Sequence, residues 1–518
     1  MNIANLLRFF LIGFTLFLFS QCSSSSEPTF PDDGTAIYHD QSLKPFYHGV
    51  ASGDPLYDRV IIWTRLTPDH PGSVQVKWEM AEDQEFKTIV NKRFALAAPA
   101  KDYTIKVDVT GLQPDTYYYY KFITKGKTSV VGRTKTAPSK ESSDVQLAIV
   151  SCSNIEFGYY NSFGNIAQRN DLDAVVHLGD YIYEYAPGTY GDTSLQRLSI
   201  PAKELITLTD YRTRYSQYRL DVDFKKAHQM HPFILIWDDH EISNDAHTLG
   251  AQNHQKEDGD YISRREAARQ AYYEWMPIRE NAGGQLYRKI EMGHIADLIM
   301  LDERLAGRTP PSESADDPTI NDEDRSMLGE QQFQWLTKNL SGSQAKWRII
   351  GNQVIFSDLN RRDIFPDKPL NLDAWDGYPA EKKKLVSYLD DNQIKNVIFV
   401  TGDTHCSWAF EVPKDLETYK KEGTTVAIEF GTPGITSANY DEYATMDTVR
   451  IAENAYRNLN PHLKYVNLHQ HGYILLQADT SQIKAEWFFT KTVKESTEEE
   501  VRGEVVYVRD GSGKILME

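Results

Sequence analysis

A carboxylate and a phenol follow a short apolar run, and side chains of these types could bind a metal. The run 174–178 is rich in valine and leucine and predicts a buried strand that stops at Gly179. Asp180 follows at once, and Tyr183 lies three residues beyond it. Both are hard oxygen ligands at the C-terminal edge of a strand. For this stretch alone, an ordinary turn with a capping aspartate is the alternative.

Five more candidates share this position, because each closely follows an apolar run. In α/β proteins, ligands bind at the carboxyl ends of the strands. We therefore expect these side chains to form one site with Asp180 and Tyr183. The five are Cys152, Asp239, His240, Asp403 and His405.

The candidates offer ligands for two kinds of ion. A thiolate from Cys152 and a phenolate from Tyr183 on one ion favour a hard, highly charged metal such as ferric iron. The carboxylates of Asp239 and Asp403 suit calcium, magnesium or manganese, and Asp180 could bridge two ions. Two ions about 4 Å apart would clamp a phosphate, generate hydroxide at neutral pH and stabilise in-line displacement.

Proton donation and substrate binding could fall to residues that do not bind the ions. His240 directly follows Asp239, so as an imidazolium near the ions it could protonate the leaving alkoxide. Arg304 could bind a substrate phosphate in a bidentate manner, or it could pair with a neighbouring acid. Asn244 is a further candidate for contact with the ions or the substrate.

Other histidines and cysteines have structural interpretations. His177 lies within its strand, which favours packing over ligation. A disulfide between Cys152 and Cys406 is the alternative to metal binding by Cys152. His469 and His471 have the spacing of a metal-binding pair, but they also fit the edge of a strand.

The charge of the chain limits its partners. Its 518 residues include 56 lysines and arginines against 74 aspartates and glutamates, a formal net charge of −18. Such an acidic chain is not expected to bind nucleic acid, because that binding depends on basic patches. If the substrate is anionic, bound cations must supply the local positive charge.

The N-terminus has the character of an export signal. Residues 5–19 are almost wholly apolar and too short for a comfortable membrane span. Residues 1–22 resemble a bacterial lipoprotein signal, with Cys22 as the lipidated residue. Plain secretion and a retained anchor over residues 6–19 are the alternatives. We expect an extracytoplasmic protein, in the periplasm or on the outer membrane of a bacterium.

The elements that position these residues fall into two domains. After a polar linker over residues 23–42, residues 43–138 hold short strands of alternating polarity, typical of an antiparallel β-sandwich of the fibronectin or immunoglobulin type. Residues 144–490 alternate strands, such as 145–150 and 397–400, with helices, such as 211–228, and predict an α/β domain with parallel pairs. Residues 491–518 are expected to be a C-terminal tail. No dinucleotide fingerprint, Walker loop or nucleophile elbow occurs in the sequence.

The motifs together resemble those of the bacterial alkaline phosphatase D (PhoD) family, in the metallophosphoesterase superfamily. The resemblance spans about residues 46–480 and implies a four-layer β-sandwich flanked by helices. It also implies an extracytoplasmic phosphodiesterase and phosphomonoesterase, with one ferric ion and calcium; zinc, manganese and magnesium are the alternative metals. The segments that carry it are Gly49–Pro55, Ser151–Cys152, His177–Glu184, Trp237–Glu241, Gly351–Gln353 and Thr401–His405.

By position, the resemblance also assigns roles. Three residues take the iron-ligand positions (Cys152, Asp180 and Tyr183), three match other metal positions (Asp239, Asp403 and His405), and His240 matches the proton donor. A further metal-binding histidine of the superfamily is not evident, and Asn352 and Gln353 stand where it might be.

Three functions fit the sequence. The first is a phosphoesterase that acts on small-molecule esters by attack of a metal-bound hydroxide, with His240 as general acid. The second is a phospholipase-D-like diesterase acting on lipid headgroups. The third is a lipid-anchored binding protein with a degenerate metal site, and the intact His240 argues against it. We expect a monomer.

Overall fold

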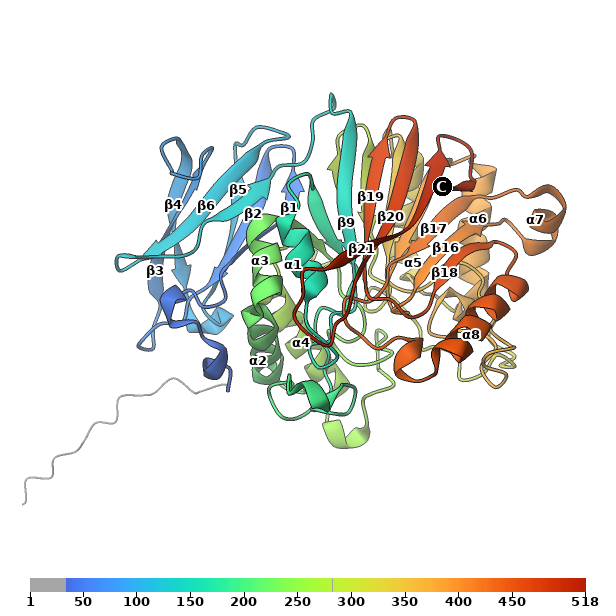
Figure 1. Ribbon diagram of the computed structural model, residues 1–518, viewed down its shortest axis with the longest axis horizontal. Coiled ribbons are helices and arrows are strands. Elements are labelled where there is room, and N and C mark those ends of the chain that lie inside the picture. Colours follow the sequence, from blue (N-terminus) through green and yellow to red (C-terminus); the bar gives the residue numbers. More distant parts are fainter. Residues whose placement is uncertain (1–33, 282) are drawn as a thin grey trace, which may run out of the picture.

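The computed structural model describes residues 34–281 and 283–518 (Figure 1). The expected signal peptide, the lipid site Cys22 and the linker up to residue 33 lie outside these residues. Within the described ranges, no helix combines the length and the apolar character that crossing a membrane requires.

The N-terminal region is an antiparallel β-sandwich, as the alternating strands predict. Tyr118, Tyr120 and Phe122 alternate along one strand and pack into its core with Trp78. One layer holds β1, β2 and β5, and the other holds β4, β3, β6 and β7, with β8 paired to β6. The strands are β1 (Val50–Leu56), β2 (Arg59–Arg65), β3 (Val74–Ala81), β4 (Ile89–Ala97), β5 (Thr104–Thr110), β6 (Tyr117–Thr124), β7 (Lys127–Thr128) and β8 (Gly132–Lys135).

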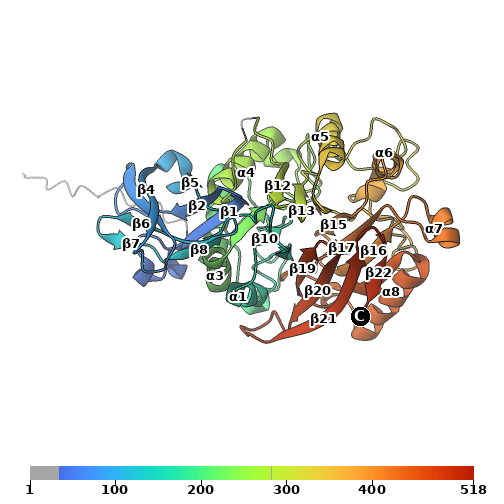
Figure 2. The same cartoon turned by 90° about the horizontal axis from the view of Figure 1, so that it is seen from above.

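The first layer of this sandwich continues into a ten-stranded sheet. Its order is β22-β21-β20-β19-β9-β10-β11-β1-β2-β5, and β1 runs parallel to β11 with Gly53 opposite Phe233. The N-terminal sandwich therefore lies at one end of the molecule without being a separate body (Figure 2). The added strands are β9 (Asp144–Val150), β10 (Ala174–His177), β11 (Pro232–Leu235), β19 (Gly472–Asp479), β20 (Gln482–Thr490), β21 (Glu500–Arg509) and β22 (Ile515–Met517).

A seven-stranded sheet packs against the ten-stranded one. Four of its strands, β13, β14, β15 and β17, run parallel, and antiparallel strands complete both edges. The strands are β12 (Arg288–Met292), β13 (Ala296–Met300), β14 (Trp347–Asn352), β15 (Val397–Thr401), β16 (Ser407–Val412), β17 (Ala427–Gly431) and β18 (Leu463–Asn467).

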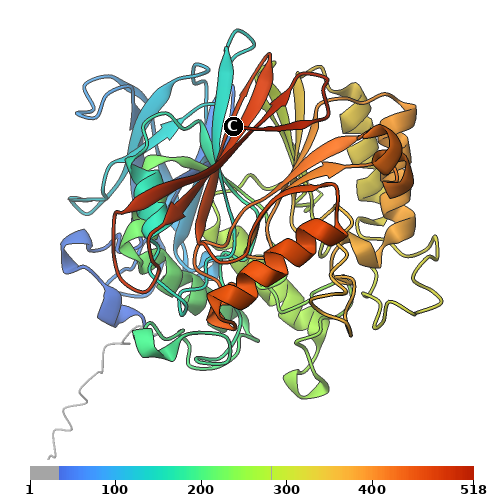
Figure 3. The ribbon, with the colours of Figure 1, turned by 45° about the vertical axis from the view of Figure 1, so that its right-hand side comes forward.

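Helices cover the outer faces of both sheets and give four layers (Figure 3). Alternation along β15 shows the arrangement. Ile398 and Val400 face the core between the sheets, whereas Val397 and Phe399 face the core under the outer helices. The helices are α1 (Asn161–Gln168), α2 (Leu208–Leu220), α3 (Val222–Met230), α4 (Tyr261–Trp275), α5 (Gly329–Gly342), α6 (Pro379–Asp391), α7 (Leu416–Glu422) and α8 (Met446–Leu459).

Two features differ from the sequence-based expectation. The segment 491–518 is not a tail, because it contains β21 and β22, which extend the edge of the ten-stranded sheet. Val506 and Val508 are buried there against the sheet. The helix expected over 211–228 is two helices, since Asp221 leaves the helical conformation and caps α3 by accepting from the amide of Asp223 at 3.0 Å.

The carboxyl ends of the parallel strands of both sheets meet at one edge. β9, β10 and β11 of one sheet and β14, β15 and β17 of the other end there. An isolated bridge joins Ser151 to Gly434, and Thr432 Oγ1 donates to the carbonyl of Ile149 at 3.0 Å. Loops after six strands are therefore held beside one another.

Candidate metal centre

Two groups of metal-binding side chains share one aspartate at this edge. The ligand atoms of Cys152, Asp180 and His405 lie within 4.8 Å of one another, and so do those of Asp180, Asp239 and His240. Asp180 is 1% exposed and belongs to both groups. Its carboxylate therefore adjoins both groups, and the sequence-based expectation that it bridges two ions stays a prediction.

The backbone that presents these ligands is strained. Cys152, Asp180, Asp403 and His405 have φ of 59°, 54°, 62° and 62°, in the left-handed region that L-residues rarely adopt. Such conformations persist only where the surroundings enforce them, and they concentrate at functional sites. Three of these residues belong to the two groups of candidate ligands, whereas Asp403 belongs to neither, and its Oδ1 lies 3.6 Å from Arg304 Nη2.

Gly179 explains the turn before Asp180. Its φ is +110°, and a Cβ there would lie 2.4 Å from the backbone nitrogen of Asp238. Only glycine allows the ends of β10 and β11 to approach this closely.

Tyr183 lies between the ligands of the first group. Its hydroxyl donates to Asp180 Oδ2 at 3.1 Å, accepts from Ser437 Oγ at 2.6 Å and lies 3.4 Å from His405 Nε2. Burial and the neighbouring Asp180 raise the pKa of this phenol. A phenolate at this position requires a cation beside it.

The charges of the centre fit bound metal ions. Oδ1 of Asp180 and Oδ2 of Asp238 are buried and have no hydrogen-bond partner among the described residues. Burial raises the pKa of the Cys152 thiol and of the Asp180 and Asp403 carboxyls, and nearby acids raise these pKa values further. A cation would offset this penalty, because buried anions need a compensating charge. The donor set of thiol, phenol, imidazole and carboxylates therefore fits metal binding.

His240 is held by a buried carboxylate. Its Nδ1 lies 2.8 Å from Glu184 Oε2, while Glu184 Oε1 accepts from the backbone amide of Asn244 and from Asn253 Nδ2, both at 2.8 Å. Burial lowers the pKa of His240, but the charges of Asp239 and Glu184 outweigh burial and raise it well above its ordinary value. Asn244 thus contributes its backbone amide, and its side chain bonds Gln252.

Arg304 is paired with acids. It is fully buried, its Nε donates to Asp238 Oδ1 at 2.5 Å, and its Nη1 donates to Asp373 Oδ2 at 2.8 Å. Its Nη2 lies 3.7 Å from Asp239 Oδ1 and 3.6 Å from Asp403 Oδ1. Arg304 therefore pairs with the carboxylates of the centre, while its Nη2 has no hydrogen-bond partner among the described residues.

Glu241 ties two strand ends together. Its carboxylate accepts from the amides of Asp180 at 3.1 Å, Tyr181 at 2.5 Å and Asp238 at 2.8 Å. Glu241 ends the motif Trp237–Glu241, but no role was predicted for it from the sequence. Its position directly after His240 was the available signal.

A third acidic group adjoins the centre. Oxygens of Asp239, Asp245 and Asp373 lie within 4.8 Å of one another, and the Asp245 amide donates to Asp239 Oδ2 at 2.6 Å. Sequence reasoning missed Asp245 and Asp373. Neither closes an apolar run, and Asp373 lies in the long segment between β14 and α6.

The remaining histidines lie outside these ligand groups. His177 is buried and stacked on Phe163 with ring centroids 6.3 Å apart, and burial lowers its pKa to about 3. His469 Nδ1 lies 3.6 Å from Glu453, and His471 Nε2 lies 3.4 Å from Glu442.

Three more residues have structural surroundings. Cys406 is a free, buried thiol, as is Cys152, so the disulfide alternative does not hold. The Asn352 side chain donates to the carbonyl of Val354, and Gln353 Nε2 donates to the carbonyl of Leu301 at 2.8 Å. Both amides therefore stabilise the β14 loop where the superfamily histidine was not evident.

Comparison with known proteins gives one consistent family. The family model "PhoD-like phosphatase" matches residues 147–487, and "PhoD-like phosphatase, N-terminal domain" matches residues 34–138. Alkaline phosphatase D of Bacillus subtilis (strain 168) is 36% identical over 495 residues, covering 91% of this chain and 82% of the relative.

A solved structure agrees with the family models. The structure described as that of PhoD superposes with a TM-score of 0.84 at 34% identity and covers 92% of this chain and 93% of its own. The resemblance and the fold class expected from the sequence are confirmed. The chain therefore belongs to the PhoD-like phosphatase family, and it is a metal-dependent phosphoric ester hydrolase.

Proposed function

We propose that this chain hydrolyses phosphodiesters and phosphomonoesters at the shared site around Asp180. The observation that carries the proposal is that Asp180 belongs to two groups of candidate ligands. In two-metal sites, the ions stabilise the attacking and leaving oxygens of the transferred phosphoryl group, and a shared carboxylate would hold both ions.

The donor types favour different metals on the two sides. Cys152 and Tyr183, with Asp180 and His405, would hold ferric iron, because thiolate and phenolate favour a hard, highly charged ion. The carboxylates of Asp239 and Asp403 would hold calcium. Lewis-acid activation of water at neutral pH and neutralisation of the phosphate charge are the chemistry that such ions supply when bound.

His240 is proposed as the general acid. Glu184 occupies its Nδ1 at 2.8 Å and so fixes the ring, and Nε2 is the nitrogen that would give its proton to the leaving alkoxide. The charges of Asp239 and Glu184 favour the protonated ring that this role requires. Arg304 would position the carboxylates, and Glu241 would position the loops.

We also propose that the protein acts outside the cytoplasm. The support is the signal-like sequence of residues 1–22, with Cys22 as the site of a lipid anchor. Globomycin treatment of cells, which blocks processing of lipoprotein signals, should retain the precursor. Unchanged processing would argue for plain secretion.

A metal analysis combined with a substrate panel tests the proposed activity. We expect iron and calcium in the purified protein and turnover of mono- and diesters. The variant His240→Ala should keep its metals and slow alkyl esters far more than activated aryl esters, because poor leaving groups need the proton. Equal slowing of both ester types would contradict the general-acid role.

A further inference from the structure

A cavity of about 600 Å³ opens directly beside the metal-ligand groups. Asp403 and His405 form the wall nearest the centre. Tyr190 also lines the cavity, and its hydroxyl lies 3.4 Å from His405 Nδ1. A volume of this size suits a small-molecule group. Since the cavity is continuous with the centre, an ester bound there can extend into it.

The walls away from the centre are mainly apolar. The one charged residue among them, Arg361, donates to the carbonyls of Lys368 at 2.8 Å and Leu370 at 2.9 Å, and its guanidinium lies 5.3 Å from the ring centroid of Phe365. Arg361 therefore fixes its own loop. The aromatic and aliphatic lining residues include Ile364, Phe365, Tyr440, Tyr443, Val449 and Ala452.

Hydrogen bonds hold one wall of the cavity in place. The turn Tyr440–Glu442 begins with a capping box in which Asn439 and Glu442 bond each other's backbone. The hydroxyls of Tyr440 and Tyr456 lie 2.8 Å apart and join this turn to α8. A preformed apolar wall binds its ligand with less loss of conformational entropy than a mobile one.

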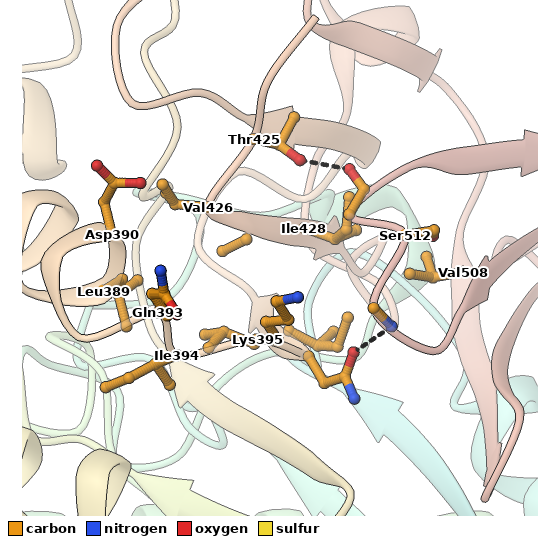
Figure 4. A pocket seen from close by; sticks show the side chains of 16 residues that line it. Leu389, Asp390, Gln393, Ile394, Lys395, Thr425, Val426, Ile428, Val508 and Ser512 are labelled. Carbon is orange, nitrogen blue, oxygen red and sulfur yellow. Dashed lines mark hydrogen bonds between the residues drawn. The ribbon is translucent and has the colours of Figure 1, made fainter.

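A second cavity, of about 300 Å³, provides a contrast (Figure 4). It lies at the opposite ends of β15 and β17, beside Val426 and Lys395, and the final hairpin closes it through Thr425 Oγ1, which donates to the carbonyl of Gly513 at 2.5 Å. It contains none of the candidate ligands. Of these two cavities, only the first adjoins the candidate metal ligands.

We propose that the cavity beside His405 is a subsite for an apolar alkyl or aryl group of the phosphate ester, with Tyr443 and Phe365 as its exposed rim. The rim residues are 72% and 38% exposed, so a chain longer than the cavity could continue outward. This inference rests on the proposed phosphoesterase activity and adds a substrate class to it. The apolar group could come from a soluble ester or from a phospholipid.

Two pairs of alkyl esters test the subsite in the metal-loaded enzyme. Methyl phosphate and hexyl phosphate have similar leaving groups, as do dimethyl phosphate and hexyl methyl phosphate. We expect kcat/KM to be about tenfold higher for the hexyl ester, equivalent to about 1.4 kcal/mol. Equal kcat/KM within each pair would overturn the subsite.

Two variants alter the cavity and one serves as a matched control. Thr448→Trp should fill the mouth of the cavity, and Tyr443→Ala should remove one rim residue. Both variants should therefore bring the ratio of kcat/KM for the hexyl ester to kcat/KM for the methyl ester toward one. Ile451→Ala removes an exposed apolar side chain of the same helix that does not line the cavity, and it should retain the wild-type ratio. A ratio that neither cavity variant changes would place the alkyl group elsewhere and contradict the proposal.

Two further measurements separate the inference from the activity and distinguish the sources. If no ester is hydrolysed, the proposed activity fails, and calorimetry with hexylphosphonate and methylphosphonate then tests the subsite alone; equal affinities would overturn it.

Phosphatidylcholine vesicles identify the source of the apolar group. If Thr448→Trp lowers hydrolysis of the vesicle lipid, the group is a lipid chain, whereas unchanged lipid hydrolysis with a lowered hexyl preference supports soluble esters.

Discussion

Among single residues, Cys152 and Cys406 can be compared directly, because both are buried, free thiols. Only Cys152 belongs to a group of metal-binding side chains. The Sγ of Cys406 lies 3.6 Å from Asn439 Oδ1 instead. Chemical type and burial are therefore matched, and position alone distinguishes the two.

We expect Cys152→Ser to lose iron and to lower kcat by about 100-fold, because a hydroxyl is a poor substitute for a thiolate ligand. Metal analysis and steady-state kinetics measure these changes, and circular dichroism should show that the fold is retained. Cys406→Ser should keep both iron and activity. Full activity of Cys152→Ser would contradict its assignment as a ligand.

The pair of Glu184 and His240 predicts a pH effect. The charge of Glu184 contributes to the raised pKa of His240, so Glu184→Gln should lower that pKa. His240 would then lose its proton at a lower pH, and the alkaline limb of the kcat profile for an alkyl ester should move to lower pH. Glu266→Gln is the control, because Glu266 pairs with Arg265 at 2.8 Å and shares no hydrogen-bond partner with Glu184 among the described residues. An unmoved limb in Glu184→Gln would separate Glu184 from the protonation of His240.

Among the elements, the approach of β10 to β11 depends on one glycine. Gly179→Ala would place a methyl group 2.4 Å from the backbone of Asp238 at a φ of +110°, so we expect a loss of about 2–3 kcal/mol in the free energy of unfolding. Urea denaturation measures this loss. Gly126→Ala is the control, since its φ is +74° but no atom lies within 4 Å of the added Cβ, and strain alone costs about 1 kcal/mol. Similar losses in both variants would show that the close approach is unimportant.

The ends of apolar runs were sufficient to predict most of the centre. Asp180, Asp239 and Asp403 each follow a parallel strand, and parallel strands bring their carboxyl ends to one edge whatever the loops contain. Asp373 could not be predicted in this way, because a long irregular segment returns it to the centre. Arg304 was ambiguous, since only the fold shows that Asp238 and Asp373 surround it.

Secondary structure, too, could be predicted from the sequence only in part. Strands with regular apolar patterns, such as β9 and β15, were predicted, but β21 was not. Its sequence from Glu500 to Arg509 mixes charged residues with valines, and it lies next to the short edge strand β22, where one face is partly open to solvent. Pairing with β20 decides its conformation, and this pairing leaves no local pattern.

Across the whole molecule, we expect the last strands to protect the sheet. Deletion of residues 500–518 would expose the edge of β20, so it should promote aggregation and lower the Tm by roughly 5 °C or more. Scanning calorimetry and light scattering measure the two effects. Ending the chain after residue 513 removes only β22 and should have a smaller effect. A Tm unchanged by the larger deletion would show that β21 contributes nothing to the sheet.

The parallel pairing of β1 with β11 makes the N-terminal sandwich part of the larger fold. Asp54, 1% exposed, forms a buried ion pair with Arg288 of the seven-stranded sheet at 2.6 Å. An unrelated sandwich substituted for residues 34–138 would leave Arg288 without its buried carboxylate and one edge of β11 without its paired strand. Although two family models divide the chain between them, we therefore expect that the two regions cannot be exchanged independently.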